Sequence, residues 1–195
     1  NGQFLNHKQI YSTGEISDFV SQYYPGESIL ALLRIYELDH NSKWLDAADK
    51  GAQYLIKNKN QETIDNHDHW LLYALNELYR HRQKPMFIEH AFKISDAIIA
   101  TQVIKPKFQD LKGSYLLPRS TPTATRSEGL CATYHLANDF GHKNQANKIL
   151  TAIKLGIIFE LQTQFRPESV VYFDDPQKAI GGFHMSLNNY EIRKR

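Results

Sequence analysis

Three short segments of the chain place ionisable side chains beside aromatic rings. They supply Tyr24 with Glu27, then His67, Asp68, His69 and Trp70, and then Arg126 with Glu128. Carboxylates and imidazoles exchange protons, and a guanidinium group can pair with an anion through two parallel hydrogen bonds. An aromatic ring adds a flat apolar face. Each segment alone is a weak signal, so the elements that position them decide whether they act together.

Apolar residues at three- and four-residue spacing predict helices on either side of these segments. A shift of 43 residues lays 26–36 on 69–79, and a further shift of about 59 lays the second copy on residues from Glu128 onward. We therefore expect a mostly α fold of repeated antiparallel helical hairpins, at 23–59, 68–102 and 126–164. Residues 188–193 are expected to begin a fourth first helix, and 1–22 a short β-like lead-in with a turn at 12–14.

Two stretches between the predicted helices are expected to be long loops. Residues 105–125 contain three prolines, which makes the stretch too proline-rich for a helix, and they include Tyr115. Residues 165–187 form the second stretch. Because long ordered loops often carry function, both are candidate functional loops, and the second is expected to fold over the same end of the molecule as the first.

If the hairpins pack side by side in one orientation, the starts of their first helices lie at one rim. Glu27 and Glu128 then have an equally good structural explanation as first-turn acids that favour the helix dipole. Asp68 is expected to cap a helix, and Trp70 is more often core than ligand-binding. Cys131 is favoured as a buried, inert thiol.

Composition excludes several classes of function. The formal charge of +2 is spread along 195 residues, so no nucleic-acid-binding stripe is visible, and no apolar run is long enough to span a membrane.

Motifs for a metal or a cofactor are also absent from the sequence. The spacing of His67 and His69 supplies no third ligand, so we expect no metal, and the absence of a Gly-rich phosphate loop predicts no cofactor. One cysteine leaves cytoplasm and periplasm equally open. Because the chain begins at Asn1 and stops as a new segment opens, we expect a fragment.

Several segments resemble the six-hairpin glycosidase-like superfamily of α/α-toroids, which includes N-acylglucosamine 2-epimerases, glucuronyl hydrolases and glucuronyl C5-epimerase-like proteins. The resemblance is carried by 24–27 (YPGE), 68–75 (DHWLLYAL), 181–183 (GGF) and 191–193 (EIR). It implies a partial (α/α)6 toroid whose rim receives a carbohydrate, such as a uronic acid or an amino sugar. A full toroid has six hairpins, so a missing segment or a partner chain would complete the ring, unless the resemblance is to a half-toroid.

We accordingly expect a carbohydrate-active domain, either glycoside hydrolase-like or sugar epimerase-like. The acid/base candidates are Glu27, His69 and Glu128. The expected substrate-binding residues are Tyr24, His67, Asp68, Trp70, Tyr115, Arg126, Tyr190, Glu191 and Arg193. The alternative from another class is a non-catalytic helical-repeat module that binds a protein, in which the rim residues are ordinary caps.

Overall fold

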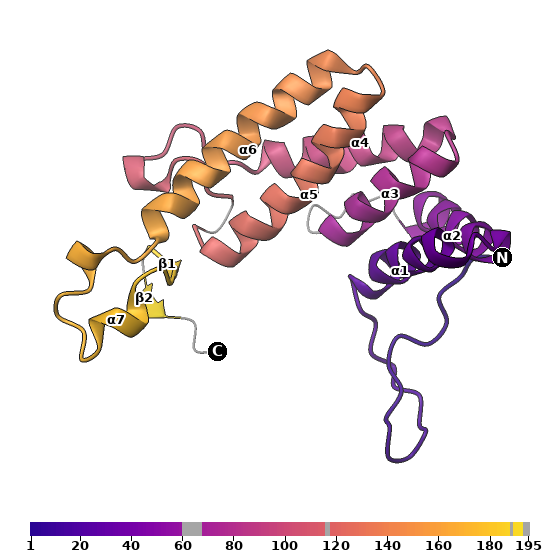
Figure 1. The fold of residues 1–195 in the computed structure, drawn as a ribbon, viewed down its shortest axis with the longest axis horizontal. Helices are drawn as coiled ribbons and strands as arrows, with labels where there is room; N and C mark the ends of the chain where they lie inside the picture. The colour runs from indigo at the N-terminus through magenta and orange to yellow at the C-terminus, as the bar shows by residue number, and fades with distance from the viewer. Residues whose placement is uncertain (60–67, 116–117, 188, 193–195) are drawn as a thin grey trace.

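The computed structural model describes residues 1–59, 68–115, 118–187 and 189–192, and this part of the chain is mostly helical. Its long helices are α1 (Tyr24–Asp39), α2 (Ser42–Tyr54), α3 (His69–His81), α4 (Pro85–Ala100), α5 (Ser120–Asp139) and α6 (Lys143–Thr163). Smaller elements are a π-helical turn (Leu55–Lys59), two 3-10 turns (Gln109–Leu111 and Pro167–Ser169), α7 (Pro176–Ala179) and the strands β1 (His184–Ser186) and β2 (Asn189–Ile192). Consecutive long helices pair as three hairpins (Figure 1).

Local signals explain where the hairpin helices begin. Pro25 lies in the first turn of α1, where its missing N–H would have no helical partner in any case. Asn41 caps α2 by accepting a hydrogen bond from the Lys43 N–H. Asp68 caps α3 as predicted, accepting from the Leu71 N–H at 2.9 Å.

The first helices of the hairpins lie side by side and run parallel. Arg34 of α1 pairs with Glu77 of α3 at 3.2 Å, and Arg80 of α3 pairs with Asp139 of α5 at 2.7 Å. These partners are 43 and 59 residues apart in the chain. Both separations equal the sequence shifts of the repeat, so equivalent positions of successive hairpins meet.

Two glycines allow these parallel helices to approach closely. A Cβ on Gly26 of α1 would lie 2.6 Å from the Leu71 N and 3.0 Å from the Trp70 Cβ. A Cβ on Gly129 of α5 would lie 2.9 Å from the Cβ of His69. The first turn of α3 is therefore held between α1 and α5.

The core lies between the first and second helices of the hairpins. Side chains such as Leu33, Leu72, Leu75, Phe87 and Ile149 are fully buried there. The arrangement is a row of three packed hairpins. No helix in the described ranges is both long enough and apolar enough to cross a membrane.

Two sequence predictions about element boundaries are wrong. Helix α5 begins at Ser120, not near Arg126, and contains Pro122. Proline is tolerated there because its position in the first turn needs no N–H donor. Residues 189–192 form strand β2, paired antiparallel with β1, so the predicted fourth helix does not start at 188.

The lead-in, residues 1–22, is hairpin-like, as expected, but it is held by a single β-bridge and contains no named strand. Gln9 and Ile16 form one antiparallel bridge around a turn that ends at Gly14, which has a φ of 72°. Figure 1 shows this segment extending away from α1 and α2. Its start is anchored, because the ring of Phe4 contacts the ring of Tyr24 and lies close to Gly51 of α2.

Candidate functional site

The structure brings two of the three acid/base candidates to one place, the junction of α3 and α5. His69 begins α3, and its Cβ and Cα lie against Gly129 of α5, the residue after Glu128. The Glu128 carboxylate faces the hydroxyl of Tyr73, one turn along α3. The ring of Tyr73 in turn lies 6.4 Å from the imidazole of His69. We call this junction, formed by Tyr23, His69, Trp70, Tyr73 and Glu128, the rim cluster.

Aromatic rings surround His69 within the rim cluster. The ring of Tyr23, just before α1, meets the imidazole edge-on at 5.4 Å, and the Trp70 ring lies 5.3 Å away at a tilt of 37°. Trp70 and Tyr73 are 5.8 Å apart and both are half-buried. His69 itself is buried, so the rings and Glu128 form the accessible part of the cluster.

Burial and charge together perturb two groups beside Glu128. Half-burial raises the pKa of the Tyr73 hydroxyl, and the Glu128 carboxylate raises it further. Burial, followed by the same carboxylate, raises the pKa of the Cys131 thiol. A raised pKa keeps the thiol protonated, which agrees with the prediction of an inert cysteine.

Glu128 does not stand in a first turn. Because α5 starts at Ser120, Glu128 lies more than two turns inside the helix and is exposed. Its explanation as a residue that favours the helix dipole is therefore lost. Glu27 is the acidic residue in the first turn of α1 and is exposed, so that explanation stands for Glu27.

Two predicted ligand-binding residues are buried behind the rim cluster. Tyr115 is fully buried and offers no stacking face, and the Arg126 guanidinium lies 5.5 Å from the centre of its ring with the residue only 4% exposed. Burial raises the pKa of the Tyr115 hydroxyl, while Arg126 and Ser127 act to lower it. In this structure Arg126 is part of the packing between helices and not an open anion clamp.

Of the remaining predicted ligand-binding residues, three lie on elements other than α3 and α5, and two lie outside the described residues. Tyr24 packs on the lead-in, with its ring 5.1 Å from that of His7. Tyr190 and Glu191 belong to strand β2. His67 and Arg193 lie outside the described residues. The described part of the chain contains no group of three or more His, Cys, Asp or Glu residues placed to hold a metal ion.

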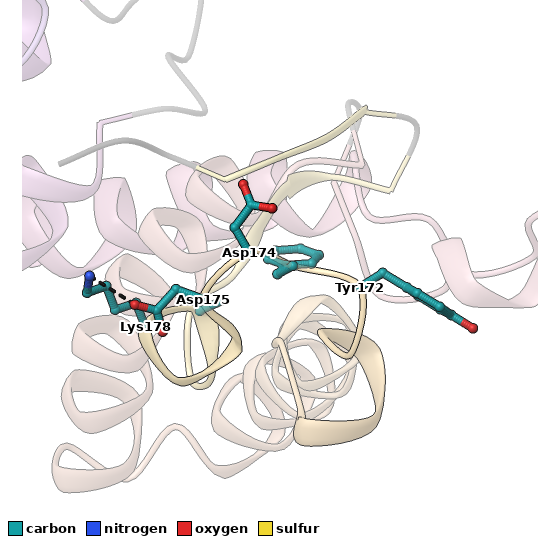
Figure 2. A pocket seen from close by; sticks show the side chains of 6 residues that line it. Tyr172, Asp174, Asp175 and Lys178 are labelled. Atoms are coloured by element: carbon teal, nitrogen blue, oxygen red, sulfur yellow. Dashed lines mark ion pairs between the residues drawn. The ribbon is translucent and has the colours of Figure 1, made fainter.

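A hollow of about 410 Å³ lies at α7, away from the predicted rim. Its lining is Tyr172, Phe173, Asp174, Asp175, Lys178 and Ala179. Figure 2 shows Asp175 paired with Lys178, at 2.9 Å, while Tyr172 points away from them. The side chains do not converge on one point, so we do not assign the hollow as the site. A smaller hollow of about 170 Å³ lies between Asn1 and the end of α2.

Sequence reasoning missed Glu160, which has the most perturbed carboxyl group among the described residues. One carboxylate oxygen is buried with no hydrogen-bond partner in the described chain, and the only compensation is a backbone hydrogen bond from Ala124 of α5. Burial raises its pKa from an ordinary value of 4.5 to about 7. The sequence did carry a signal, because position 160 lies seven residues after the buried Ile153 and four after Gly156, so a glutamate there interrupts the apolar face of α6.

The raised pKa of Glu160 should make the free energy of unfolding depend on pH. Because the folded pKa lies above the unfolded value, the folded state binds the extra proton between pH 4.5 and about 7, and stability falls as the pH rises through that window. Glu160→Gln should raise the free energy of unfolding at pH 8 by about 2 kcal/mol and change it little at pH 4. Urea unfolding at both pH values measures this. Glu168→Gln, at an exposed position, is the control, and an equal effect of both variants would contradict the assignment.

The described chain is thus mostly helical, with three packed hairpins and an aromatic and acidic junction between its first helices. Comparisons of the chain with known protein families, with curated proteins and with solved structures give no match.

Proposed function

We propose that this chain is a carbohydrate-active domain, glycoside hydrolase-like or sugar epimerase-like, which binds its sugar at the rim cluster. The observation that carries the proposal is that His69 and Glu128, 59 residues apart in the chain, meet around Tyr73 at the start of α3. Trp70 and Tyr23 frame the same spot. The resemblance to α/α-toroids points to this rim independently of the contacts.

The chemistry of the cluster fits a sugar. Pyranose rings present C–H faces that pack on aromatic rings, and their hydroxyl groups donate hydrogen bonds to a carboxylate. Glu128 is the exposed carboxylate, and in this proposal it exchanges a proton with the bound sugar. Hydrolysis needs a second carboxyl group about 5–10 Å away across the sugar, and epimerisation needs a second base on the opposite face. Glu27 is the exposed candidate for the second role, because His69 is buried.

Titration calorimetry with tetrasaccharides tests the proposal on the whole chain. Trp70→Leu should weaken binding at least tenfold, because the stacking face is lost while an apolar side chain still covers Gly26. Tyr172→Ser, at the 96% exposed residue of the α7 hollow, is the matched control and should leave affinity unchanged. If Tyr172→Ser removes binding and Trp70→Leu does not, the site is the α7 hollow and the proposal is wrong.

One observation favours a second function, a helical-repeat module that binds another helical hairpin. Ile157, Ile158 and Leu161 on α6 are 47%, 51% and 49% exposed. The exposed positions of α4, by contrast, include Glu89 and Lys93. Packing of a further hairpin, from a partner chain or from a segment that completes the toroid, would cover this apolar stripe. A concentration-dependent increase in mass that Leu161→Arg abolishes would support this function, and a constant monomer mass would count against self-association.

A further inference from the structure

The charges at the rim distinguish between sugars. We consider the described residues 23–28, 68–73 and 126–131, which surround the start of α3. Among them the exposed charged side chains are Glu27 and Glu128, both negative. Asp68 is 7% exposed and caps α3, and Arg126 is 4% exposed beside the ring of Tyr115. Within these described residues, therefore, the exposed charges are carboxylates and the Arg126 guanidinium is covered.

Like the carboxylates, the aromatic rings of the rim cluster favour a positively charged ligand. The faces of aromatic rings carry partial negative charge and attract cations, most strongly for tryptophan. Trp70 and Tyr73 are half-buried side by side, and the Tyr73 hydroxyl faces the Glu128 carboxylate. A cation seated there would contact ring faces and a carboxylate at once.

We infer that the sugar bound at the rim cluster carries a protonated amine, as an unacetylated amino sugar does, and not a carboxylate. This rests on the proposed function. An ammonium group on the sugar pairs with Glu128 while the pyranose face packs on Trp70. A uronic acid would place its carboxylate next to Glu128, where two like charges repel.

A set of four β-1,4-linked tetrasaccharides tests the inference, because its members share one backbone and differ in one substituent. The probes are the tetramers of glucose, glucosamine, N-acetylglucosamine and glucuronic acid. Calorimetry at pH 6 with the whole chain should rank glucosamine at least tenfold above glucose, with glucuronic acid weakest. Raising the salt concentration from 20 to 200 mM should reduce the advantage of glucosamine, because it depends on charge.

Glu128→Gln separates this inference from the proposed function. It should bring the glucosamine affinity down to that of glucose while glucose binding persists, whereas Glu89→Gln on the exposed face of α4 should change neither affinity. Equal binding of all four tetramers, or tighter binding of glucuronic acid, would overturn the amine inference and leave the proposed function standing. Binding of none of the four would contradict both.

Discussion

Replacing Gly129 with alanine is expected to destabilise the fold by about 2 kcal/mol, although alanine favours a helix by about 1 kcal/mol over glycine. The added Cβ would lie 2.9 Å from the His69 Cβ and 3.1 Å from its Cα, atoms that cannot move without displacing α3. Gly26→Ala should cost more, about 3 kcal/mol, because its Cβ would lie 2.6 Å from the Leu71 N. Chemical denaturation measures both changes.

An exposed position of α5 provides the control for this prediction. His135→Ala should change the free energy of unfolding by less than about 0.5 kcal/mol, because the residue is exposed. If Gly129→Ala stabilises the protein, as the helix propensity of alanine alone predicts, then α3 and α5 do not approach as closely as described.

Replacing Asp49 with asparagine is expected to lower the free energy of unfolding by about 3 kcal/mol. Its side chain is 5% exposed and accepts hydrogen bonds from Arg82 at 2.6 Å, Lys84 at 2.6 Å and Gln53 at 2.9 Å. Removing the buried charge takes away the carboxylate that pairs with Lys84 and one of the two carboxylates that pair with Arg82. This contact joins the first hairpin to the second, so its loss should destabilise both hairpins.

The neighbouring Asp46 is the matched control for Asp49. It also pairs with Arg82, but its side chain is 47% exposed, so Asp46→Asn should cost less than about 1 kcal/mol. Burial acts to raise the Asp49 pKa, but the hydrogen bonds from Lys84 and Arg82 outweigh it and hold the pKa below its usual value. The stability that Asp49 contributes is therefore present above pH 4 and lost as the pH falls below its unfolded pKa. Equal losses in the two variants would contradict the buried ion pair.

Helix periodicity and the repeat were strong enough to predict the hairpins and their register. The shift that aligned residues 26–36 with 69–79 equals the separation of the Arg34–Glu77 contact, because equivalent positions of parallel helices meet. The same register placed His69 opposite Glu128. The sequence therefore predicts which helices converge at the rim.

Burial was the part of the site that sequence patterns could not supply. Tyr115 and Arg126 have polar groups that suit a ligand, yet tertiary packing covers both. Tyr73 was missed although it lies one turn after His69, because a tyrosine on an amphipathic helix is indistinguishable from a core residue. The sequence places the start of α5 too late, because the three prolines of residues 105–125 predict a loop. The first turn of a helix nevertheless accepts a proline, and Pro122 lies in the first turn of α5.

The most direct test of the central claim uses the two tryptophans of the chain, Trp44 and Trp70. Trp70 belongs to the rim cluster, while the Trp44 indole N–H donates to Asp39 at 2.7 Å, at the turn between α1 and α2. In a nitrogen–proton NMR titration with the glucose and glucosamine tetramers, the Trp70 indole signal should shift to saturation and the Trp44 signal should stay in place. A Trp70 signal that does not move while either tetramer binds would contradict a carbohydrate site at the rim cluster.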